Sequence, residues 1–330
     1  MAQIILPLEL EREIFEIVAL SRPVYIPTMM RVAQRVKTWV EPLLYRTLFF
    51  AELIESSFLP TQLPVPRIER IDGLPVCNEK IFADVVRRKS SSFLSDSVRN
   101  VMVRNIAPEF LTTLVETCSR IENLSATRPL KFSNLTRPEF AHLRPKELHC
   151  ALHDLVDHRS NINLFSLPIF SQLTHLNLFY LLDESTDSSD STVLDRWTAV
   201  GALQSLTHLS LPSHTTRGGL PILSHLLDVC KSLRALVVLR PPPSIPNAEI
   251  AFLAKNDIRF VMMRLRSTSD DWQIGALAGS DHWARVDEFI AKRAAGEISR
   301  EIFYMEEFEG EGENLSPTVS SKSEVLVPVS

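Results

Sequence analysis

Hydrophobic residues near the start of the chain recur at helical spacing. Leu10, Ile14, Ile17 and Val18 lie four, three and one positions apart, with Phe15 beside them. This pattern predicts an amphipathic helix of about three turns that ends before Pro23.

Two further helices are expected in the first fifty residues. Pro27 suits the first turn of the second, whose apolar face would be Met29, Met30, Val32, Ala33 and Val36. The third, restarted at Pro42, would continue through Leu48 and Phe49. Three short helices bury too little surface to be stable alone. Residues 1–50 are therefore expected to form a helical module that either docks on a partner or caps the next domain.

The following stretch changes in composition. Residues 51–78 contain Pro60, Pro64, Pro66 and Pro75, which favour an extended linker. Helical spacing resumes over residues 79–88, where a second domain should begin.

One register of apolar positions then recurs along the chain. With Leu124, Leu176, Leu209 or Leu236 as reference, apolar residues fall three and six positions before it and two after it. Weaker copies are centred on Val101, Leu148 and Val261, at intervals between 23 and 33 residues. The pattern resembles the LxxLxL signature of leucine-rich repeats, in an irregular form.

Such repeats alternate a short strand with a return segment, and neither buries its apolar side until a neighbour stacks on it. The return segments with helical spacing are residues 108–117, 194–203, 219–230 and 247–255. The fold class expected is α/β: the helical module followed by an irregular leucine-rich-repeat solenoid over residues 79–266, shaped as an arc or horseshoe. Outward strand residues on the concave side would then be candidates for recognising a partner: Arg99, His175, Asn177, His208, Ser210 and Arg234.

The C-terminal part should close this array. Trp272 and a helix over residues 281–292, with Ser280 as its N-cap, would shield the last repeat, within a capping segment of residues 267–305. Residues 306–330 have the composition of a disordered acidic tail, and residues 183–192 that of an acidic, serine-rich loop.

Composition excludes several classes of function. A net charge of −5 provides no basic field for nucleic acid, and 9 glycines match no phosphate-binding loop. Charged residues interrupt the first twenty positions, and no uncharged apolar run reaches membrane-spanning length. The expected location is cytoplasmic or nuclear, where four widely spaced cysteines would be free thiols.

Catalytic signals are weak. His149, His153 and His158 near Cys150 form the best metal-like cluster, yet His149 and Cys150 should alternate across a strand. Cys118 and Cys230 occupy equivalent repeat positions, which favours packing over catalysis. We expect no enzyme activity, metal or cofactor.

The helical module resembles a divergent F-box of the kind common in mushroom-forming fungi. The resemblance rests on Leu6-Pro7-x-Glu9 with Ile14-Phe15, on residues 32–36 with Trp39, and on Glu41-Pro42-Leu43-Leu44-Tyr45-Arg46. It implies docking on a Skp-type adaptor of a cullin-based ubiquitin ligase. The interface residues that it implies are Leu6, Pro7, Ile14, Phe15, Val32, Val36, Trp39, Leu43 and Tyr45.

Three hypotheses follow for the function. The first is a substrate-recognition subunit of a Skp/cullin/F-box ubiquitin ligase, which binds an unknown protein target through its repeats. The second is a stand-alone repeat scaffold whose module is only a cap. The third, a hydrolase or metal enzyme, has the least support.

Overall fold

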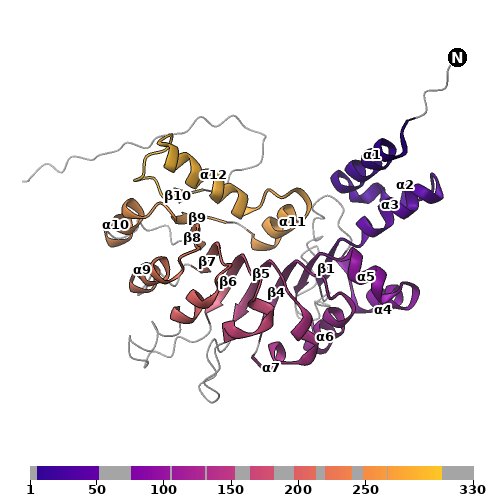
Figure 1. Ribbon diagram of the computed structural model, residues 1–330, viewed down its shortest axis with the longest axis horizontal. Helices are drawn as coiled ribbons and strands as arrows, with labels where there is room; N and C mark the ends of the chain where they lie inside the picture. The colour runs from indigo at the N-terminus through magenta and orange to yellow at the C-terminus, as the bar shows by residue number, and fades with distance from the viewer. Residues whose placement is uncertain are drawn as a thin grey trace, which may run out of the picture.

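In a computed structural model of the chain, the described residues are 6–51, 76–104, 106–130, 132–152, 164–181, 197–212, 220–239, 248–265 and 267–306. They form an α/β fold (Figure 1). The predicted linker, the acidic loop and the acidic tail lie almost wholly outside these residues.

One sheet organises the described part of the chain. Its ten strands follow the order β10-β9-β8-β7-β6-β5-β4-β3-β1-β2, and every neighbouring pair is parallel. The strands are β1 (Thr47–Ala51), β2 (Val76–Cys77), β3 (Asn100–Arg104), β4 (Asn123–Leu130), β5 (Glu147–Leu152), β6 (His175–Leu181), β7 (His208–Pro212), β8 (Ala235–Leu239), β9 (Phe260–Met263) and β10 (Tyr304–Met305). From β3 onward, each strand pairs with the next one in sequence.

Helices connect the strands. The α-helices are α1 (Leu8–Ser21), α2 (Ile26–Met29), α3 (Gln34–Leu44), α4 (Glu79–Arg88), α5 (Ser91–Ser97), α6 (Pro108–Thr117), α7 (Phe132–Leu135), α9 (Leu220–Val229), α10 (Ala248–Asn256), α11 (Thr268–Ala278) and α12 (His282–Ala295). The 3-10 helices are η1 (Pro23–Tyr25), η2 (Pro138–His142), η3 (Leu164–Ser166), η4 (Pro168–Phe170) and η5 (Ala199–Ala202).

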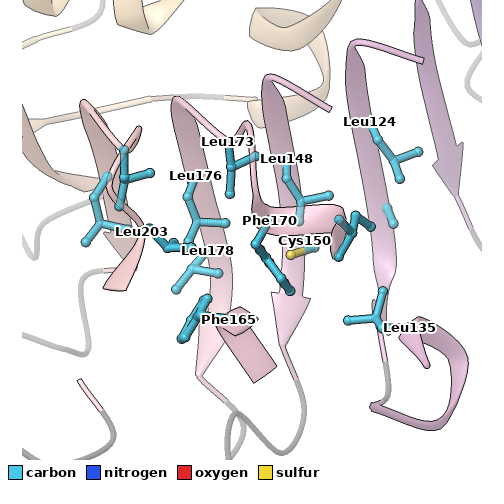
Figure 2. Packing of buried hydrophobic residues seen from close by; sticks show 14 of the residues in the cluster. Leu124, Leu135, Leu148, Cys150, Phe165, Phe170, Leu173, Leu176, Leu178 and Leu203 are labelled. Carbon is cyan, nitrogen blue, oxygen red and sulfur yellow. The ribbon is translucent and has the colours of Figure 1, made fainter. Parts of the chain in front are cut away.

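The recurring register pairs the reference residue of each strand with the reference residue of the neighbouring strand. Val101, Leu124, Leu148, Leu176, Leu209 and Leu236 pair in that order across β3 to β8, and all are fully buried. Figure 2 shows Leu124, Leu148 and Leu176 on neighbouring strands of this core. The prediction for the last copy is wrong by one position, because Leu236 pairs with Phe260 and Val261 faces the other side of the sheet.

We call this side of the sheet the leucine face. Helices α4, α5, α6, α9 and α10 each bury apolar residues against it. The helices predicted over residues 79–88, 108–117, 219–230 and 247–255 are confirmed within one residue at each end. In the remaining segment, residues 194–203, the described part contains the 3-10 helix η5.

Two predictions for the N-terminal region need correction. The second helix breaks between Met29 and Gln34, and the third ends at Leu44. Residues 47–51 form β1, in which Leu48 pairs with Val101 and joins the core of the leucine face. The four-residue apolar run from Leu48 to Ala51 does not distinguish a helix end from a buried strand, and tertiary pairing decides between them. Residues 76–77 of the predicted linker likewise form a strand, β2.

The opposite side of the sheet is covered by the C-terminal helices. Helix α12 packs Val286 and Phe289 on apolar residues of β8 and β9, as expected of a cap. Helix α11 extends the cover to the other end of the sheet, where Trp272 packs on Phe49 of β1 and Met102 of β3. These helices therefore cover strands at both ends of the sheet, whereas the sequence predicted cover only at its C-terminal end (Figure 1).

Candidate functional site

The helical module, residues 6–46, has a small core of its own. Ala19, Ile26, Met29, Val36 and Val40 are buried in it, and apolar parts of α1 and α3 close around them. A two-bond ion pair from Arg35 of α3 to Glu11 of α1 holds the helices together, at 2.8 and 3.1 Å.

The same module exposes much apolar surface. Fourteen large hydrophobic side chains in the described residues are exposed, and ten of them lie between residues 6 and 32. We call these ten the apolar face: Leu6, Leu8, Leu10, Ile14, Ile17, Val18, Leu20, Val24, Tyr25 and Val32. Concentrated apolar exposure of this kind marks an interaction surface.

Helix α1 has two apolar stripes. Phe15 and Ala19 face the module core, whereas Leu10, Ile14 and Ile17, one turn apart, point away from it. The stripe that the sequence pattern selected as amphipathic is thus the exposed one. Ile14 and Ile17 are 51% and 58% exposed, which makes them available to a partner.

Eight of the nine adaptor-binding candidates fall into three groups by exposure. Leu6, Pro7, Ile14 and Val32 are exposed, whereas Phe15, Trp39 and Leu43 are half-buried against the module core. Val36 is fully buried and cannot contact a partner in this conformation.

The ninth candidate, Tyr45, lies against the sheet. It packs edge-on to Phe93 of α5, with ring centres 5.5 Å apart. Sequence reasoning missed Leu8, Leu20, Val24 and Tyr25 of the apolar face, because they lie outside the spacing of Leu10, Ile14, Ile17 and Val18.

The second candidate surface is the side of the sheet opposite the leucine face, which we call the polar face. Asn123, Ser125, His149, Asn177 and Ser210 are buried on it and come from β4 to β7.

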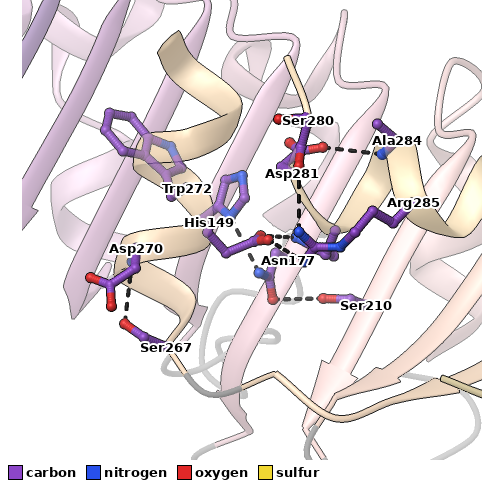
Figure 3. Close-up of polar contacts among 12 residues, drawn as sticks. His149, Asn177, Ser210, Ser267, Asp270, Trp272, Ser280, Asp281, Ala284 and Arg285 are labelled. Carbon is purple, nitrogen blue, oxygen red and sulfur yellow. Dashed lines mark hydrogen bonds and ion pairs between the residues drawn. The ribbon is translucent and has the colours of Figure 1, made fainter. Parts of the chain in front are cut away.

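Of the six partner-binding candidates, Asn177, His208 and Ser210 were expected to be exposed, and this is wrong because all three are buried. Trp283 of α12 packs against His208, and Figure 3 shows Asn177 and Ser210 on the side of the sheet that carries the C-terminal helices. His175 is half-buried there. Arg99 is half-buried and paired with Glu122 at 3.3 Å, and only Arg234 is exposed.

Hydrogen bonds run across the strands of the polar face (Figure 3). The Ser210 hydroxyl donates to Asn177 Oδ1 at 2.6 Å, and Asn177 Nδ2 donates to His149 Nδ1 at 3.2 Å. The other ring nitrogen of His149, Nε2, lies 3.9 Å from a Glu147 oxygen. The row is a network of mainly uncharged groups.

A second row contains two stacked histidines. The rings of His175 and His208 are 4.1 Å apart and nearly parallel, and Trp283 of α12 packs against both. His208 Nε2 lies 2.9 Å from a carboxylate oxygen of Asp287. Burial, followed by the charge of His208, lowers the pKa of His175 to about 4. The sequence signal for this row is the repeated Leu-Thr-His-Leu at residues 173–176 and 206–209.

Two contacts fix the C-terminal helices to each other and to the sheet. The indole nitrogen of Trp272 donates to Asn123 Oδ1 at 2.6 Å. Asp271 of α11 is bound by His282 at 2.5 Å and by Arg285 at 2.6 Å, both from α12. Burial alone would raise the pKa of Asp271, but the His282 hydrogen bond and the Arg285 charge outweigh it and lower the pKa.

An open cleft of about 390 Å³ lies between these helices and the ends of the strands. Glu147 and Asp281 line it, together with His175 and Trp283. Burial, with the charges of Glu147 and Asp271, raises the pKa of Asp281 despite His282.

The described residues hold no group of three His, Cys, Asp or Glu side chains arranged to bind a metal ion. Cys150 is buried on the leucine face and His149 on the polar face, as their alternation predicted; His153 and His158 lie outside the described residues. Cys118 and Cys230 are buried at equivalent positions, and burial raises their pKa values to about 12 and about 11. Thiols with such pKa values are poor nucleophiles.

Among the helices of the described segments, none combines the length and the apolar character that crossing a bilayer requires. No protein-family model matches the chain, and no curated protein is similar enough to count as a match.

Proposed function

We propose that this protein is a substrate-recognition subunit of a Skp/cullin/F-box type of ubiquitin ligase, working in the cytoplasm or nucleus. Its helical module would be a divergent F-box that binds a Skp-type adaptor. The parallel strands, with one buried apolar reference residue each, would be an irregular leucine-rich-repeat arc that presents the target. The observation that carries the proposal is the apolar face, because it is exposed although the module has a closed core of its own.

The attachment of the module supports such a role. The backbone continues from α3 directly into β1, Lys89 of α4 binds Glu41 of α3 at 2.7 Å, and Tyr45 packs on Phe93. These contacts fix the module at one end of the sheet while the apolar face stays free. A rigid connection of this kind would hold a bound target at a fixed distance from the adaptor.

The same contacts also favour a second function, a stand-alone scaffold whose module only caps the sheet. The two proposals differ in what the exposed isoleucines do. In a scaffold they have no binding role, whereas in a receptor they contribute directly to adaptor affinity. Substitutions on the apolar face therefore separate the proposals without disturbing the cap.

Ile14→Asp combined with Ile17→Asp should abolish adaptor binding and leave folding unchanged, since both side chains already face water. Burying charged groups in an apolar interface is unfavourable in free energy, and it should weaken binding by at least about 100-fold. The measurement is calorimetric titration with a purified Skp-type adaptor, with circular dichroism to confirm folding.

Ile81→Asp is the matched control, because Ile81 of α4 is 47% exposed and lies outside the module. It should bind the adaptor as the wild type does. No binding by the wild type, or equal binding by the double variant, would contradict the receptor proposal and leave the scaffold.

A further inference from the structure

Helix α11 is attached to the sheet mainly through one aromatic side chain. Trp272 is fully buried between Phe49 and Met102, and its indole nitrogen donates to Asn123. A second bond runs from the Asn100 side-chain amide to the carbonyl oxygen of Ala276, at 3.3 Å. An anchoring aromatic residue surrounded by polar contacts is the usual composition of a helix bound in a groove.

Several buried polar atoms near this anchor have no hydrogen-bond partner among the described residues. Ser125 Oγ, His149 Nε2 and His282 Nε2 are buried at the junction of α11, α12 and the sheet, and none has a hydrogen-bond partner among the described residues. The rings of His149 and His282 lie 6.2 Å apart, edge to face. Ser125 and His149 belong to the sheet and His282 begins α12, so these unpaired groups weaken the contact between the first turn of α12 and the polar face, beside the end of α11.

Helix α12 is anchored near its C-terminal end, whereas α11 has Trp272 bound to the sheet and Asp271 bound to His282 and Arg285 of α12. Arg293 is buried near its end and donates to the carbonyl oxygens of Ala254, Ile258, Phe260 and Arg300 at 2.8 to 3.0 Å. Val286 and Phe289 add apolar contacts with β8 and β9. The two helices therefore differ in how they are attached: α12 is bound to backbone carbonyl groups through Arg293, and α11 is bound to the sheet through Trp272.

The connection between them contains a suitable hinge. Gly279 ends α11 in the left-handed conformation, with φ at +67°. One turn earlier, Gly275 lies so close to Asp281 that a Cβ atom there would be 2.7 Å from the Asp281 Cβ. Closure of α11 on α12 thus requires a glycine at position 275.

Helix α11 also adjoins the helical module, as Figure 1 shows. Ala276 and Leu277 of α11 share a pocket of about 290 Å³ with Leu20 and Pro23 of the module. The surface beneath α11 is consequently the part of the polar face nearest the apolar face.

We propose that the surface under α11 is the target-binding site of this receptor, and that α11 occupies it until a target displaces it. The matching target segment is a short helix that carries a tryptophan or another large aromatic residue, as α11 carries Trp272. This inference rests on the proposed function for the role of the target. The presence of the site itself can be tested without the adaptor.

The test uses full-length Trp272→Ala and a fluorescent synthetic peptide with the sequence of residues 267–279. We expect the peptide to bind this variant, because its indole can enter the site between Phe49 and Met102. It should bind the wild type much more weakly, since the tethered α11 competes at high effective concentration. Replacing the tryptophan of the peptide by alanine should weaken binding at least about tenfold.

Trp39→Ala is the matched control, because it removes a tryptophan from the module and leaves α11 in place. It should bind the peptide no better than the wild type does. A folded Trp272→Ala protein that does not bind the peptide would overturn the proposal.

Hydrogen–deuterium exchange tests the hinge in the wild type and in Gly275→Ala. Backbone amides of α11 should exchange sooner than those of α12 in the wild type, and sooner still in Gly275→Ala because the added methyl group forces α11 away from Asp281. Exchange of both helices at the same rate would show that α11 does not open separately. Loss of adaptor binding would affect neither result, so the failure of one proposal is distinguishable from the failure of the other.

Discussion

Leu176→Ala should lower the free energy of unfolding by about 3 to 5 kcal/mol, the range for a fully buried leucine whose surroundings cannot collapse. Leu176 is fully buried in β6, and its register partners Leu148 and Leu209 lie on the strands to either side. Because backbone hydrogen bonds fix both neighbouring strands, they cannot move in to fill the cavity. Guanidinium denaturation followed by circular dichroism measures the loss, and the slope of the transition shows whether unfolding remains cooperative.

Two control variants show whether this loss of stability comes from the buried volume of Leu176. Leu176→Met nearly conserves the volume and should cost less than about 1.5 kcal/mol. Leu20→Ala removes the same atoms from a side chain that is 41% exposed and should change stability by about 0.5 kcal/mol or less. If Leu176→Ala lowered the free energy of unfolding by less than about 1 kcal/mol, the leucine face would not be the rigid core of the molecule.

Acidification from pH 7.5 to pH 5 should destabilise the folded protein through His175. Its pKa falls from 6.5 to about 4 on folding, so between these values the unfolded chain binds the extra proton and the folded chain does not. Stability is therefore lost as the pH falls through this window. After allowance for partial solvent exposure, the loss due to His175 should be about 1 to 2 kcal/mol at pH 5.

The surroundings of His175 make this effect specific. His208 stacks on it, while His149, Glu147 and Asp287 are the other charged or titratable groups that influence it. Glu147 and Asp287 favour the protonated ring, but burial and the neighbouring histidines outweigh them.

Denaturation curves at both pH values should show a smaller difference for His175→Asn than for the wild type. His142→Asn is the control, because His142 is exposed on η2 and should leave the difference unchanged. An identical pH dependence in His175→Asn and the wild type would disprove the assignment.

Local patterns in the sequence were sufficient to predict the α/β class and the inward residues of most central strands. The reference residues from Val101 to Leu236 were identified from their spacing, because each strand needs one inward residue at the same height. The last copy shifted by one residue because both Phe260 and Val261 are apolar and both sides of β9 are buried, so hydrophobicity alone does not fix the register there.

The two candidate surfaces were predictable to different degrees. The stripe of Leu10, Ile14 and Ile17 is visible in the sequence, but its periodicity gives only the position of a face, not whether that face meets the core or water. The outward strand residues were identified as a face of the sheet, yet nothing local indicated that α11 and α12 would bury His208, Asn177 and Ser210.

The sequence by itself therefore determined the alternation of strands and helices in the middle of the chain and the inward positions of β3 to β8, because these depend on residues close together in the chain. Only the tertiary structure decided that residues 47–51 form a strand, that the apolar face of α1 remains exposed, and that the C-terminal helices lie along the polar face. The hydrogen bond from Trp272 to Asn123 joins residues 149 positions apart. Contacts at such separation have no periodic signal, since they arise only when the whole sheet is in place to form them.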